Sequence, residues 1–412
     1  MSVLIPPKPL VSVIIPTHNR ARLLREAVNS VFAQDGLGEL FDLEVIVIDD
    51  ASSDDTFDIV RQFPSLRYLR FDVNRGPSIA RNAGIAGSAG RYIAFLDDDD
   101  IWLPARLKVQ VPILEHQNEI GVVYGHGWVK DLHGNLVLWP HSGPSGRVFE
   151  EFLVRTDDFI NIDTLLVRRD AIDRAGLFDE SIETMEHYEF ALRLAFHYPW
   201  HFVQGPIARG MESKQGKYYQ DVVSGSNERT LPIIIEKALS LLPDSPDSEV
   251  MRRRAKTAVC ATIAGQRWWG GEGVESVRAF LLSELQAKPW LGAAPAIWQH
   301  IRKTARVLAL SSNDPLGAVT RFWEDVVRIL RPELPGPQYR WGSFLAEAAE
   351  ALREEGCSPF HAGSLALRGL LRDPLQCNRR LLRIIANMPV LMLTRPARRL
   401  LQACGIMKPD VQ

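Results

Sequence analysis

The sequence predicts an α/β domain with a mostly parallel sheet and helices on both faces, followed by an all-α domain. Short apolar, β-rich runs alternate with helical patterns through the first half of the chain. Strand signals then stop near residue 225, and proline-punctuated helical patterns continue toward the C-terminus. Such alternation is typical of parallel sheets whose crossover helices cover both faces. We therefore expect an α/β domain over residues 1–224 and an all-helical domain over residues 225–412.

Four strands are predicted first, each from a run rich in β-branched and aromatic residues. These runs are residues 11–16, 43–49, 66–71 and 91–97. The helical patterns that follow each of them are residues 20–33, 55–63, 78–88 and 104–117. Between about residues 120 and 205 the pattern is mixed, with strand-like segments followed by a loop and a helix.

Composition excludes several classes of protein. The 48 basic and 50 acidic residues give a net charge of −2, so no chain-wide field favours nucleic acid. The N-terminus lacks a signal-peptide pattern, and no uncharged apolar run reaches the ~20 residues of a membrane span. The cysteines lack metal-ligand spacing and indicate reduced thiols. We expect a cytoplasmic protein, at most peripheral on the inner face of the membrane.

Polar side chains follow three of the four predicted strands. These are Thr17, His18 and Asn19 after the first, Asp49 and Asp50 after the second, and Asp97 to Asp100 after the fourth. Ligands bind at the carboxyl ends of strands in open parallel sheets. The sequence therefore predicts a binding site at this edge.

The four consecutive aspartates, Asp97 to Asp100, raise an electrostatic problem. Two like charges ~4 Å apart repel by about 4 kcal/mol at an effective dielectric of about 20. Either the carboxylates point apart into water or a cation holds them together. On a continuing strand, Asp97 and Asp99 would share one side and Asp98 would face away. We expect Asp100 to begin the following helix.

Five ordered motifs over residues 11–195 resemble glycosyltransferase family 2. They are VSVIIPTHNR, VIVIDDASSDDT, NRGPSIARNAGI, YIAFLDDDDIWLP and AGLFDE. The resemblance implies the GT-A fold, a Rossmann-like and mostly parallel sheet with helices on both faces. It further implies an inverting, metal-dependent enzyme of the hexosyltransferase type. Such an enzyme moves a sugar from a nucleotide diphosphate, with a UDP-sugar as our first choice, to an acceptor hydroxyl. Residues 225–412 are not covered by the resemblance.

The first motifs supply the expected donor site. Pro16 is expected to end its strand, so that Thr17 and Asn19 can turn polar groups toward a ligand. The alternative is turn chemistry, which we favour for His18 and Arg20.

Other donor contacts follow from the resemblance alone. Asp50 matches the family aspartate that contacts the nucleotide base, Arg81 matches an arginine near the nucleotide, and Asp98 is the candidate for the ribose. Asp99 is the expected ligand of a divalent cation, Mn²⁺ or Mg²⁺, with Asp97 as a ligating or supporting partner. Such hard cations take carboxylate and phosphate oxygens together.

The position of the catalytic base departs from the family pattern. A Glu-Asp pair in the family is Glu186-His187 here, so His187 occupies the place of the base. Thr184 is expected to cap the helix whose first turn carries His187. Glu186 is the alternative candidate for the base. Histidine is a competent base near neutral pH. A substituted, inactive site is the alternative.

Two kinds of function therefore remain open. The first is glycosyl transfer to a glycan, lipid-linked or protein acceptor, as in cell-surface polysaccharide assembly, with no nucleic acid partner. The second is a noncatalytic nucleotide-sugar-binding or scaffold protein. The basic leucine-rich segment at residues 367–401 predicts contact with a partner or an anionic membrane surface, or else a solvated face of a packed domain.

Overall fold

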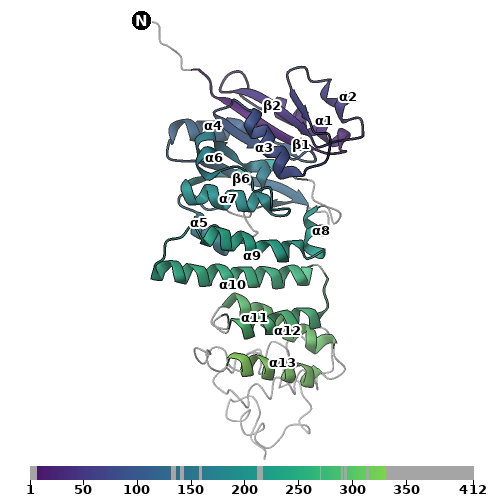
Figure 1. The fold of residues 1–412 in the computed structure, drawn as a ribbon, viewed down its shortest axis with the longest axis vertical. Coiled ribbons are helices and arrows are strands. Elements are labelled where there is room, and N and C mark those ends of the chain that lie inside the picture. Colours follow the sequence, from purple (N-terminus) through teal and green to yellow (C-terminus); the bar gives the residue numbers. More distant parts are fainter. Residues whose placement is uncertain are drawn as a thin grey trace, which may run out of the picture. The chain divides into compact units, whose positions relative to one another are not determined.

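Two compact units divide the chain, the first ending at Val259 and the second beginning at Cys260. The computed structural model describes residues 7–130, 136–139, 143–156, 160–210, 217–269, 271–288, 291, 295–311 and 315–330 (Figure 1). The basic segment at 367–401 lies outside the described residues. The domain boundary near residue 225 stays a prediction.

The centre of the first unit is a nine-stranded sheet. Strand β1 (Leu10–Thr17) pairs in parallel with β2 (Asp42–Asp49) on one side and with β4 (Tyr92–Phe95) on the other. Strand β3 (Arg67–Arg70) pairs in parallel with β2 and completes the order β3-β2-β1-β4. The predicted parallel α/β architecture is confirmed. The segments after β1, β2 and β4 consequently meet at one edge of the sheet.

The other strands of the sheet extend this parallel core through mostly antiparallel pairings. Strand β8 (Leu166–Arg168) pairs with β4, and β6 (Val122–Lys130) pairs with β8. Strand β9 (Trp200–Arg209) runs parallel to β6, and β5 (Ile101–Trp102) is antiparallel to β9. Strand β7 (Leu136–Trp139) is antiparallel to β6. The sheet is therefore mixed outside its first four strands.

The expectation that Pro16 ends β1 is wrong. The strand continues to Thr17, and Pro16 keeps its register with Ile48 of β2. Pairing with β4 ends at Ile14, opposite Phe95, so β1 has one paired neighbour where the proline lies. A proline has no N–H to donate, and a position without a second neighbour tolerates it.

One face of the sheet packs on helices α1 (Ala21–Phe32) and α4 (Arg106–His116). Val11, Val13 and Ile15 of β1 are buried in that layer with the apolar side chains of both helices. Alternate residues of a strand point to opposite faces, which leaves Ile14 for the other side.

The other face packs on α3 (Pro77–Gly87). A Cβ atom added at Gly84 of α3 would lie 2.5 Å from the side chain of Ile14 and 2.8 Å from that of Ile48. Glycine therefore allows the helix to approach the sheet closely. This approach sets the position of the α3 side chains that reach the site.

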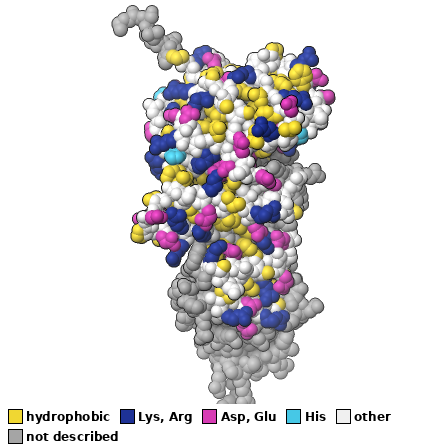
Figure 2. All heavy atoms as spheres, in the orientation of Figure 1, with side chains coloured by type: hydrophobic (Ala, Val, Ile, Leu, Met, Phe, Trp, Pro, Cys, Tyr) yellow, Lys and Arg dark blue, Asp and Glu magenta, His cyan; other side chains and the backbone are white. Residues whose placement is uncertain are grey.

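The remaining helices of the first unit are short except α7, α9 and α10. They are α2 (Thr56–Val60), α5 (Phe149–Val154), η1 (Ile162–Thr164), α6 (Arg169–Ala175), α7 (Glu186–His197), α8 (Lys217–Val223), α9 (Ser226–Leu239) and α10 (Pro246–Trp269). Helix α10 continues past the end of this unit. Basic and acidic side chains are interspersed over the described surface drawn in Figure 2.

Helices α11 (Val274–Ala287), α12 (Pro295–Ser311) and α13 (Pro315–Leu330) belong to the second unit. Each helix buries apolar side chains, for example Leu281 on α11, Ile301 on α12 and Phe322 on α13. Beyond residue 225, where the sequence predicts helices alone, the described residues form helices and no strand. Within the described parts of the chain, no helix is long and apolar enough to span a bilayer.

Replacing Phe152 by alanine should lower the free energy of unfolding by about 3–5 kcal/mol. Phe152 is fully buried, and its ring centroid lies 5.1 Å from that of Trp200 in an edge-to-face contact. Phe57, which is 47% exposed, provides the matched control, with an expected loss of about 1 kcal/mol. Urea unfolding followed by tryptophan fluorescence measures both. Equal losses would contradict the burial described here.

Candidate active site

The loops after β1 and β2 are joined through Asn19. Its side-chain Oδ1 accepts the N–H of Ser53 at 2.7 Å, and its own N–H donates to Oγ of Ser52 at 2.9 Å. Asn19 and Ala51 have φ values of 54° and 64°, in the left-handed region. Such strain is about 1–3 kcal/mol per residue and clusters at functional sites. The Asn19 contacts hold the strained backbone at the edge of the sheet.

Asp50 lies at the same edge and is buried. Its two carboxylate oxygens accept the N–H groups of Arg75 at 2.7 Å and Gly76 at 2.8 Å. Gly76 has φ 87°, a conformation that favours glycine, and it directly precedes α3. Asp50 thus fixes the loop that leads into α3.

The acid cluster Asp97 to Asp100 does not continue strand β4. The strand ends at Phe95, and the N–H of Asp100 donates to the carbonyl of Asp97 in a turn. Asp97 and Asp99 are each about one-third exposed, at 35% and 34% of their side chains, whereas Asp98 is buried. The turn, rather than strand alternation, separates Asp98 from its neighbours.

Arg20 supplies positive charge to this cluster. Its Nη1 donates to Asp98 at 3.0 Å and lies 2.7 Å from Asp99. Asp98 also accepts the hydroxyl of Thr17 at 2.7 Å. Burial raises the pKa of Asp98 to about 6, although Thr17 and Arg20 act in the opposite direction. Arg20 therefore belongs to the site, and the sequence analysis missed this because it treated Arg20 as a turn residue.

Arg81 joins the acid cluster to helix α7. Arg81 is 3% exposed, and its guanidinium donates to Asp97 at 2.7 Å and to Glu186 at 2.8 Å. Burial alone would lower the pKa of Arg81, but the two carboxylates outweigh it and raise the pKa. Burial would likewise raise the pKa of Glu186, yet Arg81 and then His187 bring it below its usual value. Arg81 and Glu186 are thus both charged.

The first turn of α7 carries the two candidate bases. Glu186 is the first residue of the helix and is buried, while the adjacent His187 is half-buried. The expected cap at Thr184 is wrong. Met185 is the N-cap, with φ 59°, and no side chain caps the helix. The buried hydroxyl of Thr184 has no hydrogen-bond partner.

The Phe178-Asp179-Glu180 stretch forms a loop against α3 and α7. Asn82 of α3 accepts the N–H of Phe178 at 2.9 Å and donates to its carbonyl at 3.0 Å. The Phe178 ring stacks on Phe190 of α7, with centroids 4.1 Å apart. These contacts bring the start of α7 next to α3, and therefore next to Arg81.

Asp163 is a second residue that the sequence analysis missed. It is buried on η1, accepts the N–H of Asp97 at 2.7 Å and shares a side-chain hydrogen bond with Asp100. Burial raises the pKa of Asp163 to about 6. Asp100 thus pairs with Asp163 and does not begin a helix, since α4 begins only at Arg106. The one available signal was an acidic residue within the otherwise strand-like NIDTLLVRR.

The acid cluster fits a divalent cation whose coordination shell is completed by oxygens of a diphosphate. Asp97 and Asp99 each engage an arginine through one oxygen and are partly exposed. Mg²⁺ is usually held by one or two carboxylates together with substrate phosphates. Across the part of the chain that the structure describes, no group of three His, Cys, Asp or Glu side chains could hold a metal by itself.

Comparison with known proteins identifies the class. The model of the family described as "Glycosyl transferase family 2" matches residues 12–175. WcaA of Escherichia coli K12, a candidate colanic acid biosynthesis glycosyl transferase, is 30% identical over 208 residues, 47% of this chain and 69% of WcaA. The chain therefore belongs to glycosyltransferase family 2.

In other relatives, the segment that matches this chain is a smaller share of the relative's length. An uncharacterized glycosyltransferase of Nostoc sp. is 37% identical over 118 residues, which are 28% of this chain and 35% of the relative. The chain thus spans about a third of that protein.

The expected GT-A fold is confirmed by structural likeness. A mannosyltransferase of Pyrobaculum calidifontis, in complex with GDP-mannose and Mn²⁺, superposes with a TM-score of 0.50. It is 21% identical, and the match covers 80% of this chain and 89% of that one.

Replacing Arg81 by methionine should lower the free energy of unfolding by about 3–5 kcal/mol at neutral pH, because two carboxylates lose a buried partner. The lowered pKa of Glu186 means that its stabilisation is present above the unfolded-state pKa of about 4.3 and is lost as the pH falls. The difference from wild type should therefore stay nearly constant from pH 7 to about 5 and shrink as the pH falls below about 4.

Denaturant unfolding across this pH range measures the effect. Arg61→Met is the matched control, since Arg61 is 68% exposed and lies 4.0 Å from Asp58. A loss for Arg81→Met that matches the control, or that does not change with pH, would contradict the bridge.

Proposed function

We propose that this chain is an inverting glycosyltransferase that moves a sugar from a nucleotide diphosphate donor to an acceptor hydroxyl. The observation that carries the proposal is the Arg81 bridge. It connects Asp97, at the carboxyl edge of the sheet, with Glu186, at the start of the helix that bears His187. A donor motif and a candidate base are thus held side by side by a buried ion pair. Membership of family 2 supports the same class of reaction.

The donor would lie over the edge formed by β1, β2 and β4. We propose contacts from the residues of that edge, namely Pro16, Thr17, Asn19, Asp50, Arg81 and Asp98. A UDP-sugar is the donor that we favour from the sequence. Because the Pyrobaculum protein holds GDP-mannose, a GDP-sugar is the second donor to test.

The divalent cation, Mn²⁺ or Mg²⁺, would be held by Asp99 with Asp97. When bound, it would neutralise the diphosphate and help it to leave. Arg20 already offsets the charge of Asp98 and Asp99, so the site holds fixed positive charge beside the metal ligands. Carboxylates alone would repel a diphosphate, and both sources of positive charge reverse that.

His187 is the base that we propose. Its imidazole would take the proton of the acceptor hydroxyl as that oxygen attacks the anomeric carbon and the bond to the diphosphate breaks. Glu186 is less suited, because its ion pair with buried Arg81 lowers its pKa and makes it a weaker base. Its negative charge instead lies next to His187 and would stabilise the imidazolium.

The acceptor would be a glycan, a lipid-linked molecule or a protein. The assignment of WcaA to colanic acid biosynthesis supports polysaccharide assembly.

A noncatalytic nucleotide-sugar-binding protein is the alternative, and histidine in place of the family aspartate is the observation that favours it. Slow hydrolysis of UDP- or GDP-sugars by the purified protein with Mn²⁺ separates the two functions. Binding without any turnover would favour the alternative.

Replacing His187 by alanine should reduce turnover by about 10²–10⁴, the usual contribution of a general base, and leave donor affinity unchanged. His187→Asp, which restores the family pattern, should retain part of the activity. Glu186→Gln is measured beside them and should lose less. Kinetics of nucleotide release, with calorimetry for donor binding, give both numbers. Full activity in His187→Ala would rule out the histidine base.

Replacing Asp99 by asparagine should weaken UDP or GDP binding in Mn²⁺ by about 10-fold or more, because the cation loses a charged ligand. Asp58→Asn is the matched control, since the Asp58 side chain is 69% exposed on α2. Titration calorimetry with and without EDTA measures the affinities. If EDTA changes neither wild type nor Asp99→Asn, the metal has no role in binding.

A further inference from the structure

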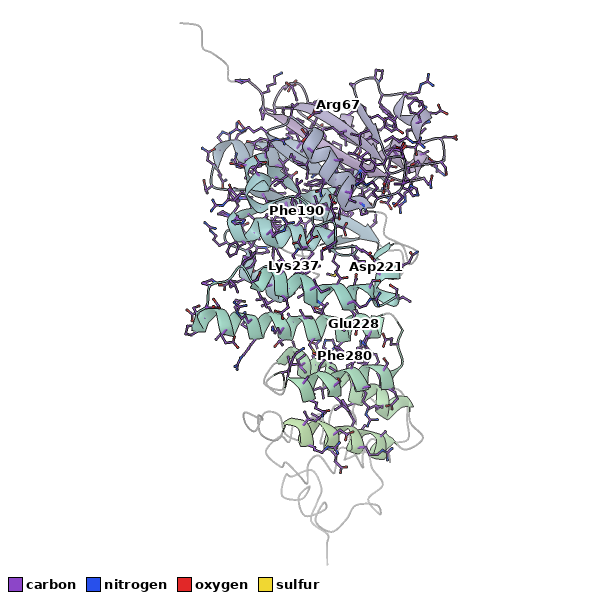
Figure 3. All side chains as sticks on the ribbon, in the orientation of Figure 1. Arg67, Phe190, Asp221, Glu228, Lys237 and Phe280 are labelled. Atoms are coloured by element: carbon purple, nitrogen blue, oxygen red, sulfur yellow. The ribbon has the colours of Figure 1, made fainter. Side chains whose placement is uncertain are left out.

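Helix α9 lies outside residues 12–175, the part of the chain that the family model matches. Its last turn carries Lys237, which lies beside α7 (Figure 3). The Lys237 ammonium donates to Asp179 in the loop before α7 and, at 2.8 Å, to Glu189 in the first turn of α7. The Lys237 side chain thus connects α9 to the loop before α7 and to the first turn of α7, the helix that carries His187.

Glu189 is the centre of this network. It is 2% exposed, and Arg193 of the same helix donates to both of its oxygens, at 2.9 and 2.7 Å. Arg193 also donates to the carbonyls of Ala175 and Leu177, so it anchors the loop before α7. The network therefore contains two carboxylates, Asp179 and Glu189, and two cations, Arg193 and Lys237, so its charges balance.

The charges of the network stabilise one another. Hydrogen bonds from Lys237 and Ser181 bring the pKa of Asp179 well below its usual range. Burial alone would lower the pKa of Lys237, but Asp179 and Glu189 raise it. Arg193 moves with α7 because it belongs to that helix, whereas Lys237 connects α7 to another element. Lys237 is therefore the group that fixes the turn from outside.

The first turn of α7 is held from two sides. Arg81 of α3 binds Glu186, and Lys237 of α9 binds Glu189, with His187 between the two glutamates. The N-cap Met185 has left-handed backbone and no side-chain cap stabilises the turn, so its position depends on these outside contacts. A displacement of about 1 Å at a reacting group can reduce the rate about 10²-fold.

We propose that Lys237 is a positioning residue for His187, and that α9 is thereby a working part of the catalytic unit. This proposal rests on the proposed function, in which His187 is the base. Lys237 itself would touch neither donor nor acceptor. It would act by holding Glu189 and Asp179.

Lys237→Met in the full-length protein tests this. Hydrogen exchange of peptides covering residues 176–190 should become faster, and turnover of the donor should fall about 10- to 100-fold. Affinity for UDP or GDP with Mn²⁺, and the KM for the donor, should not change. Lys237→Arg should restore most of the turnover, because it can reach both carboxylates.

Lys256→Met is the matched control. Lys256 on α10 also bridges to α9, lying 2.8 Å from Glu236, and its side chain is 38% exposed, close to the 41% of Lys237. Its partner Glu236 is 59% exposed, and neither residue belongs to the site. It should alter neither the exchange of residues 176–190 nor turnover.

The two readouts separate the proposals. Unchanged exchange in Lys237→Met, or an equal effect in Lys256→Met, would overturn the positioning role whatever the activity. Faster exchange with full turnover would show that the turn is held but not needed for catalysis, which also overturns it. If wild type turns over no donor, the proposed function fails, and with it the catalytic role of Lys237, whereas the exchange result still reports whether Lys237 holds the turn.

Discussion

The buried guanidinium of Arg81 is the interaction on which the candidate site depends. A charge that is 3% exposed must be paired, and here its partners come from the end of β4 and from the start of α7. Removing either carboxylate would leave the guanidinium undercompensated. The geometry between the acid cluster and the His187 turn is therefore fixed by electrostatics as well as by packing. Gly84 makes this possible, since it lets α3 approach the sheet closely enough for Arg81 to reach both sides.

Strain gathers around the same edge of the sheet. Among the described residues, the non-glycine positions with left-handed backbone are Asn19, Ala51 and Met185, and each lies in a segment that borders the site. Side-chain bonds from Asn19 hold the first two, while the ion pairs of Glu186 and Glu189 hold the turn that follows Met185. Strained backbone maintained by its surroundings is typical of sites that are organised before the ligand arrives. The candidate site has that character.

The sequence predicted what depends on local pattern. Apolar runs located β1 to β4 because parallel buried strands are almost continuously hydrophobic, and the acids after them located the edge. The sequence could not predict side-chain contacts between residues that lie far apart along the chain. Arg20, Asp163 and Lys237 are of this kind, since each meets its hydrogen-bond or ion-pair partner only after the chain has folded. The cap at Thr184 failed for a related reason, because ion pairs from other helices hold the turn instead.

The four aspartates are accommodated in three ways: Arg20 and Arg81 supply positive charge, the turn separates Asp98, and Asp100 shares a hydrogen bond with Asp163. A cation bound by Asp99 would add to this arrangement. The most direct test of the central claim is a crystal structure with Mn²⁺ and UDP or GDP, using the anomalous signal of manganese. We predict manganese on Asp99, the diphosphate beside it, and an intact Arg81–Glu186 pair that presents His187 to the donor. A diphosphate bound away from this edge, or His187 turned away from it with the pair broken, would contradict the account.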